Sequence, residues 1–148
     1  MAVDVSTDIV IRRPRDRVAA YAADPDRAPD WYVNIKSAEW TTPKPLGIGS
    51  RVTFVAEFLG RRLRYTYEVV DYVPGRKLVM STAEGPFPME TTYLWEETEK
   101  SATRMTLRNR GEPVGFSKAL GPLMAFAIRR ANRKDLRRLK LILEHESR

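Results

Sequence analysis

Thirty residues near the end of the chain, Ser117 to Glu146, have the pattern of one long amphipathic helix. At about 100° per residue, apolar side chains recur on one stripe and basic side chains on the opposite side. The apolar stripe comprises Met124, Ile128, Ala131, Leu139, Ile142 and Leu143, and the basic side comprises Arg129, Arg130, Arg133, Arg137 and Lys140. A helix of about seven turns is too long for a small bundle, so its apolar stripe needs a large partner surface.

The preceding hundred residues supply that surface, because they are typical of β-strands. Apolar and polar residues alternate in Val3 to Ile11, and similar strands are predicted at Ile35 to Thr41, at Arg51 to Phe58 and in four segments between Leu63 and Asn109. Two short helices are predicted between the first two strands, one ending near Ala23 and one from Asp26 to Asn34. The expected class is α+β, with a long helix laid across a curved antiparallel sheet.

Composition limits the chemistry that the chain can perform. We expect one domain over 1–148, since 148 residues suit a single core. The sequence has no cysteine, and its one histidine, His145, lies at the end of the long helix. Disulfides, thiolate catalysis and the usual metal ligands are therefore not expected, and no cofactor is predicted. With no apolar run of membrane-spanning length and no signal segment, the expected location is the cytoplasm.

The net charge of +7 is concentrated in the long helix. From Lys118 to Arg148 there are nine Lys or Arg against three Asp or Glu. Such an excess attracts nucleic acid or anionic membranes, although a solvated helix face also explains it. No nucleic-acid motif accompanies the charge, so nucleic acid is not an expected partner. Peripheral contact with an anionic membrane stays open as a hypothesis.

The order of elements and several short motifs resemble the START-like, helix-grip superfamily, also called SRPBCC, and within it the polyketide cyclase/dehydrase group. The resemblance covers nearly the whole chain. Its motifs are Ile9-Val10-Ile11 leading into Arg13-Pro14 and Val18, Asp24 followed by Trp31, Gly47-Ile48-Gly49-Ser50, the strand end Val69 to Pro74 with Arg76-Lys77-Leu78, Thr103-Arg104-Met105-Thr106, and Leu136, Leu139, Lys140 and Glu144.

The resemblance implies a sheet of about seven antiparallel strands wrapped around the C-terminal helix, with a deep apolar cavity between them. It implies that the ligand is a lipid, a polyketide, a steroid or a similar apolar molecule. It does not imply one reaction, because the same fold serves carriers, receptors, cyclases and hydrolases.

Strand alternation identifies the side chains that would face such a cavity. A filled interior is the alternative interpretation of the same pattern. The predicted ligand-binding residues are Trp31, Phe54, Tyr67, Met80, Met89, Tyr93, Trp95 and Met105, with Met124, Ile128, Asn132 and Asp135 from the helix.

Asp135 interrupts the apolar stripe of the helix, with Asn132 close by. In one interpretation its side chain bends to the surface or pairs with Arg138. In the other, Asp135 and Asn132 point into a cavity and meet a ligand or a buried arginine.

The inventory for catalysis is small. A nucleophile activated by histidine is not available, which leaves carboxylates and tyrosines as acids or bases. Strand parity turns Glu57 and Glu90 towards solvent, so Tyr67, Tyr93 and Asp135 remain as candidates. Two functions stay open: a carrier or sensor of an apolar small molecule, and a cyclase, aromatase or dehydratase acting on a polyketide-like substrate. The oligomeric state is not predicted.

Overall fold

The computed structural model describes residues 3–85, 87–99, 101–112 and 121–146. The elements are β1 (Val3–Ile11), α1 (Arg15–Ala22), the 3₁₀ helix η1 (Pro25–Arg27), α2 (Ala28–Trp31), β2 (Ile35–Trp40), β3 (Arg51–Phe58), β4 (Arg61–Val73), β5 (Lys77–Glu84), β6 (Met89–Glu99), β7 (Ala102–Gly111) and α3 (Gly121–Glu144).

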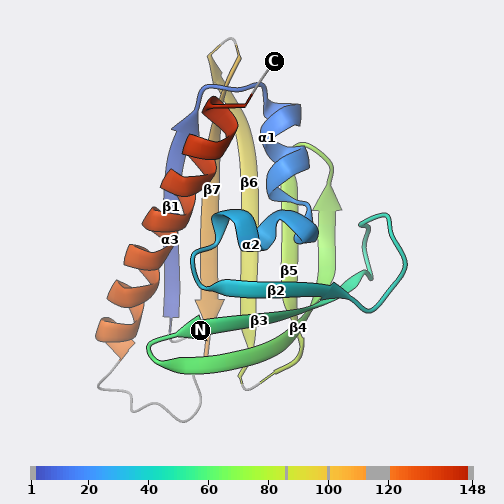
Figure 1. Ribbon diagram of the computed structural model, residues 1–148, viewed down its shortest axis with the longest axis vertical. Coiled ribbons are helices and arrows are strands. Elements are labelled where there is room, and N and C mark those ends of the chain that lie inside the picture. Colours follow the sequence, from blue (N-terminus) through green and yellow to red (C-terminus); the bar gives the residue numbers. More distant parts are fainter. Residues whose placement is uncertain (1–2, 86, 100, 113–120, 147–148) are drawn as a thin grey trace.

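The strands form one antiparallel sheet in the order β1-β7-β6-β5-β4-β3-β2. Strands β2 to β7 follow one another as a meander. The last strand, β7, pairs with β1 at the edge of the sheet, from Val3 opposite Gly111 to Ile11 opposite Thr103. Figure 1 shows α3 lying across this end of the sheet. The predicted fold, a seven-stranded curved sheet with a long C-terminal helix and short helices after the first strand, is confirmed.

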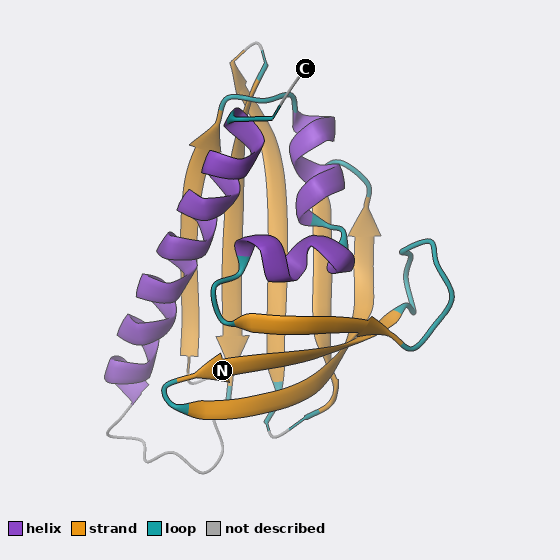
Figure 2. Cartoon of the chain, viewed as in Figure 1, coloured by secondary structure: helices purple, strands orange, loops and turns teal. Residues whose placement is uncertain are grey.

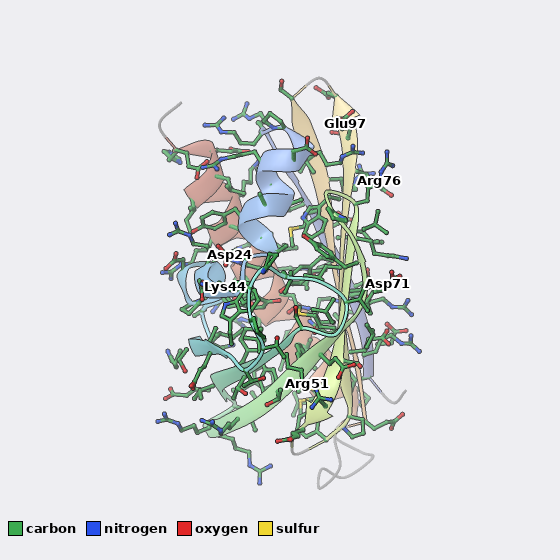
Figure 3. All side chains as sticks on the ribbon, turned by 90° about the vertical axis from the view of Figure 1, so that its right-hand side faces the viewer. Asp24, Lys44, Arg51, Asp71, Arg76 and Glu97 are labelled. Atoms are coloured by element: carbon green, nitrogen blue, oxygen red, sulfur yellow. The ribbon has the colours of Figure 1, made fainter. Side chains whose placement is uncertain are left out.

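The sheet curls because its longest strand changes register twice. Strand β4 has 13 residues, and its pairing with β5 shifts between Thr66 and Tyr67 and again between Val69 and Asp71. Such bulges bend a strand and increase its twist. In Figure 2 the strands β2 and β3 and the first part of β4 therefore cross in front of the more upright β5, β6 and β7, while the second part of β4 stands beside β5. The edge-on view in Figure 3 places the helices on one side of the sheet, with Asp71 and Arg76 on the other.

The turn between β3 and β4 is a tight hairpin. Phe58 pairs with Arg61, which leaves Leu59 and Gly60 as the two-residue loop. Both have positive φ, 52° and 76°, as the favoured twist of a tight hairpin requires. Leu59 is thereby held in an unusual conformation and exposed at the hairpin tip.

Two predicted helices have different limits in the structure. The expected helix from Asp26 to Asn34 is divided into η1 and α2, where Pro29 has no backbone N–H to donate. The long helix is predicted from Ser117 to Glu146; the described part is α3, Gly121–Glu144, and 117–120 lie outside the described residues.

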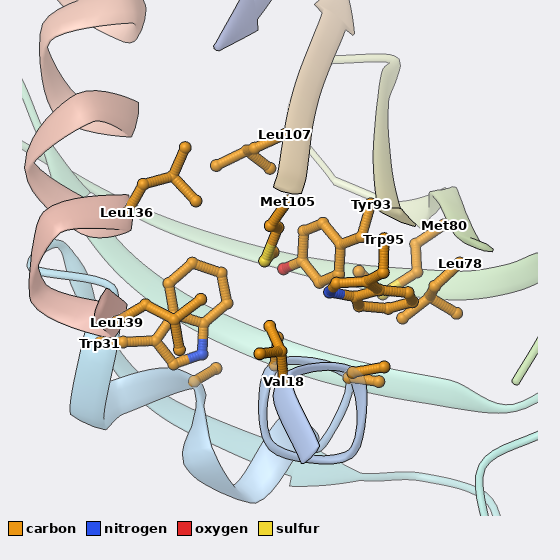
Figure 4. Close-up of a cluster of buried hydrophobic side chains, with 14 of the residues drawn as sticks. Val18, Trp31, Leu78, Met80, Tyr93, Trp95, Met105, Leu107, Leu136 and Leu139 are labelled. Carbon is orange, nitrogen blue, oxygen red and sulfur yellow. The ribbon is translucent and has the colours of Figure 1, made fainter. Parts of the chain in front are cut away.

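The C-terminal half of α3 packs into a filled core. Leu136, Leu139 and Leu143 are almost completely buried there, although the predicted apolar stripe left out Leu136. Figure 4 shows Leu136 and Leu139 facing the side chains of β7 and α2 that complete this core. These neighbours include Trp31 of α2 and Met105 and Leu107 of β7, and Trp95 of β6 belongs to the same core.

Hydrogen bonds tie the same end of α3 to the corner between β1 and α1. The Lys140 Nζ donates to the Val10 carbonyl at 2.6 Å, and the Arg13 Nη2 donates to the Glu144 carbonyl at 2.8 Å. The Arg12 backbone N–H donates to Glu144 Oε2 at 2.8 Å. The Arg13 contact satisfies a carbonyl group at the end of the helix, which has no partner within it.

Leu139→Ala should lower the free energy of unfolding by about 2–5 kcal/mol, because it removes a fully buried side chain from a filled core. Leu141→Ala, on the same helix, removes a side chain that is 59% exposed and should change stability by less than about 0.5 kcal/mol. Urea denaturation measures both. Equal losses in the two variants would contradict the assignment of the core face.

Candidate functional site

A cavity of about 180 Å³ lies between the N-terminal half of α3 and the curled sheet. Most of the predicted ligand-binding residues line it: Phe54, Tyr67, Met80, Met89, Tyr93, Met124, Ile128, Asn132 and Asp135. They come from β3, β4, β5, β6 and α3, so residues far apart in sequence meet at one site. The surfaces exposed to the cavity are mostly apolar, as in small-molecule binding sites.

Three predicted residues do not reach the cavity. Trp31, Trp95 and Met105 are buried in the filled core beneath the C-terminal half of α3. Trp95 and Met105 have the inward orientation that strand parity predicts. However, they lie further along their strands, where leucines of α3 fill the space.

Several residues that line the cavity are not among the ligand-binding residues that the sequence predicts. Tyr65 lies on the same face of β4 as Tyr67, and Thr91 lies on the same face of β6 as Met89 and Tyr93, so parity could have identified both. Tyr32 follows α2, outside any strand, and no sequence pattern pointed to it.

One wall of the cavity is an aromatic cluster on neighbouring strands. The ring centroids of Tyr65 and Tyr67 are 5.0 Å apart, and Phe54 lies 5.7 Å from Tyr65 and 6.0 Å from Tyr67. The rings are tilted or edge-on, the arrangements that the aromatic quadrupole favours. The result is a broad apolar surface whose polar atoms are limited to the tyrosine hydroxyls.

A chain of hydrogen bonds links further lining residues of β4, β6 and β7 beside this wall. The Thr91 Oγ1 donates to Asn109 Oδ1 at 2.8 Å and lies 2.8 Å from the Tyr67 hydroxyl. Because threonine has one hydroxyl proton, Tyr67 must donate to Thr91. Burial raises the pKa of Tyr67 to about 12, so this candidate stays protonated at neutral pH and is poorly suited to act as a base.

A second tyrosine sits where α2 approaches β6. The hydroxyl oxygens of Tyr32 and Tyr93 are 2.5 Å apart, and burial raises the pKa of both phenols well above the usual value. Only one of the two protons lies between the oxygens, so the other can be donated to a ligand.

Asp135 and Asn132 occupy the α3 face of the cavity and are only 3% and 4% exposed. Asp135 Oδ1 accepts a hydrogen bond from the Val33 backbone N–H at 2.9 Å. Burial raises the pKa of the Asp135 carboxyl to about 7, while the Val33 N–H and the charge of Arg138 act in the opposite direction. A side chain that bends to the surface, one of the two interpretations of the sequence, does not describe this residue.

The Asn132 side chain is incompletely satisfied. Its Nδ2 is buried and makes no hydrogen bond with any residue that the structure describes. A buried donor without a partner is costly, by about 1–3 kcal/mol, and therefore calls for an explanation. In a cavity wall, a ligand can supply the missing acceptor.

Glu57 and Glu90 do not contribute carboxylates to the cavity. Glu57 is exposed, and Glu90 pairs with Arg110 at 3.3 Å. Among residues 3–85, 87–99, 101–112 and 121–146, no three His, Cys, Asp or Glu side chains gather as they would around a metal ion. None of the helices in these ranges is long and apolar enough to cross a membrane.

A cavity between a curled seven-stranded sheet and its C-terminal helix agrees with the comparison to protein families. The model of the family "Polyketide cyclase / dehydrase and lipid transport" matches residues 2–144. The chain belongs to this family. No curated protein sequence matches it closely enough to count as a relative.

Solved structures show the same fold in proteins of low sequence identity. The TTHA0849 protein of Thermus thermophilus superposes with a TM-score of 0.83 at 22% identity, over 97% of this chain and 99% of that one. The Zhui aromatase/cyclase of Streptomyces sp. R1128 gives 0.81 at 17% identity, over 98% and 95%. A START superfamily protein of Mycobacterium smegmatis gives 0.73 at 16% identity, over 95% and 94%. At these identities the likeness shows the fold alone.

The raised pKa of Asp135 predicts a pH dependence of stability. The folded protein keeps this proton up to about pH 7, whereas the unfolded chain loses it near the ordinary value of 3.8. The folded state thus binds more protons in this interval, and the free energy of unfolding should fall as pH rises from about 4 through 7. Asp135→Asn removes the titrating carboxyl, so this decline should disappear. The amide oxygen can still accept from the Val33 N–H, which keeps the local contact.

Urea denaturation between pH 4 and pH 8 measures the difference. Asp135→Asn should gain stability relative to the wild type as pH rises, by at most about 4 kcal/mol. Asp8→Asn, at an exposed position of β1, is the control and should show no comparable gain. A constant difference between Asp135→Asn and the wild type at all pH values would contradict the raised pKa.

Proposed function

We propose that the protein binds a hydrophobic small molecule, a lipid, a polyketide or a similar compound, in the cavity beneath α3 and acts as its carrier or sensor. The observation that carries the proposal is an apolar cavity with one buried, unpartnered amide, that of Asn132, in its wall. Family membership supports the same class of ligand.

The polar atoms restrict the chemistry of the ligand. Asn132 Nδ2 needs an acceptor such as a carbonyl or hydroxyl oxygen, and Asp135 can accept from a ligand hydroxyl or, when protonated, donate to a carbonyl. Both side chains project from the same face of α3, three residues apart. The ligand is therefore an apolar molecule with one oxygen-bearing end directed at α3.

The remaining wall suits a flat or flexible apolar body. The aromatic cluster of Phe54, Tyr65 and Tyr67 offers broad ring faces, while Met80 and Met89 are unbranched and can adapt to different shapes. Shape selectivity by this wall should be modest, so the polar end would carry most of the specificity.

Native mass spectrometry of the purified protein tests the proposal. The wild type should retain a small molecule that solvent extraction releases unchanged. Ala131→Phe adds a ring at the cavity wall and should reduce its occupancy several-fold. Lys134→Phe, which adds the same ring at an exposed position of α3, is the matched control and should retain the ligand.

An empty wild-type protein that also fails to bind Nile red, a neutral apolar dye, would contradict the proposal, because an accessible apolar cavity should admit it. So would equal occupancy in the wild type and Ala131→Phe, provided that urea denaturation shows both to be folded.

A cyclase, aromatase or dehydratase acting in the same cavity is the second candidate. Asp135 favours it, because a carboxyl with a pKa of about 7 can give or take a proton at neutral pH. The Tyr32–Tyr93 pair offers a hydroxyl donor in the same cavity. The common fold with an aromatase/cyclase adds support at the level of architecture.

Conversion of a linear polyketide substrate, followed by liquid chromatography and mass spectrometry, distinguishes the two functions. For an enzyme, Asp135→Asn should lower kcat by about 10²–10⁴-fold and leave ligand affinity within a few-fold. Tyr93→Phe tests the hydroxyl donor, with Tyr72→Phe, outside the cavity, as control. Full turnover in both Asp135→Asn and Tyr93→Phe would exclude these residues from the chemistry, and unchanged ligand with the wild type would favour the carrier.

A further inference from the structure

The outward face of α3 carries a second pattern that the cavity does not explain. Its residues fall within an arc of about 80° along the helix and extend over about 27 Å. This outer stripe consists of Leu123, Phe126, Arg130, Arg133, Arg137 and Leu141.

The apolar members of the outer stripe are open to solvent. Leu123 is 62% exposed, and Phe126 and Leu141 are each 59% exposed. Isolated exposed leucines are ordinary, but three large apolar side chains on one line of one helix, with three arginines between Phe126 and Leu141, form a surface with a specific composition.

The positive charge of this face is not neutralised by the described part of the protein. Arg130, Arg133 and Arg137 form no ion pair within the described residues, and neither do Arg129 and Lys134 beside them. The two acids of α3 lie elsewhere. Asp135 is buried on the cavity side, and Glu144 binds Lys140 at 2.6 Å.

We propose that the outer stripe docks on the surface of an anionic phospholipid bilayer, with α3 parallel to the membrane. Its arginines would bind lipid phosphates, for which the planar guanidinium is well shaped. Phe126, Leu123 and Leu141 would enter the boundary between headgroups and acyl chains. Basic residues together with exposed Phe and Leu are the composition of helices that lie in this interfacial region, where the cations contact headgroups and the apolar side chains enter the acyl boundary.

Charge complementarity selects the membrane over other occupants. A second copy of the chain in a symmetric contact would bring the same arginines against each other, where like charges repel. Nucleic acid would pair with the arginines but would leave the exposed leucines without an apolar environment. An anionic bilayer satisfies both kinds of side chain.

The outer stripe also lies beside the entrance of the cavity. Leu123 and Phe126 share the first turns of α3 with Met124 and Ile128, which line the cavity. The exposed Leu59 lines it as well, at the tip of the β3–β4 hairpin, so the cavity reaches the surface there. Figure 1 shows this hairpin near the start of α3. Docking of the outer stripe would bring this entrance to the bilayer, so that a ligand can pass from the bilayer into the cavity. This transfer rests on the proposed function, whereas the docking does not.

Co-sedimentation with phospholipid vesicles tests the docking. At low salt the wild type should bind vesicles of phosphatidylcholine and phosphatidylglycerol in equal parts, bind pure phosphatidylcholine weakly, and dissociate as salt is added. Arg133→Ala/Arg137→Ala should weaken binding by roughly 25-fold, about fivefold for each cation removed from the surface. Phe126→Ala should weaken binding while keeping the net charge.

Arg76→Ala/Arg104→Ala is the matched control, because it removes the same charge from positions outside α3. Equal losses in the two double variants would show that overall charge alone drives the binding and would overturn the docking surface. It would also be overturned by no association with anionic vesicles, or by a wild-type dimer in analytical ultracentrifugation that Phe126→Ala converts to a monomer. Ala131→Phe should bind vesicles as the wild type does, which separates this test from that of the cavity.

Discussion

The packing of the C-terminal half of α3 on the sheet is the interaction on which the rest of the structure depends. Leu136, Leu139 and Leu143 leave no space against the sheet and α2, and Lys140 and Glu144 tie the helix end to the β1–α1 corner. One end of the helix is thus held rigidly. The other half spans a sheet that curls in front of it, and Ala131, Asn132 and Asp135 face inward there together with Met124 and Ile128. The cavity lies where the leucines end.

The two polar residues on the inward side of α3, Asn132 and Asp135, lower the stability of the fold relative to apolar side chains at the same positions. Asn132 and Asp135 immediately precede the leucine-rich half and lie on the same inward side of α3. Apolar side chains at both positions would remove an unpartnered amide and a desolvated carboxyl from the interior. Their presence is the kind of local conflict with stability that binding and catalytic sites show.

Alternation of residue types was sufficient to predict the sheet, the inward face of each strand and the break at Asp135. It could not separate lining from core, because Tyr93 and Trp95 are consecutive inward residues of β6 and only Tyr93 lines the cavity. That distinction depends on how far the helix remains in contact with a curled sheet, and the curl comes from register shifts in β4 that leave no clear mark in the sequence. Tyr32 could not be predicted for a different reason: it follows α2, outside any strand whose alternation would mark its inward face.

The side chains of α3 lie in three different environments, and each environment requires a different kind of residue. Its leucines fix it to the sheet, its inward Asn132 and Asp135 face the cavity, and its outward arginines face solvent or an anionic surface. Because adjacent residues point about 100° apart, Met124 and Phe126 occupy the same turn but different environments. An apolar molecule at the entrance would therefore meet a nearly continuous apolar path around the first turns of α3. A filled cavity would remove the end of that path and leave the outer surface unchanged.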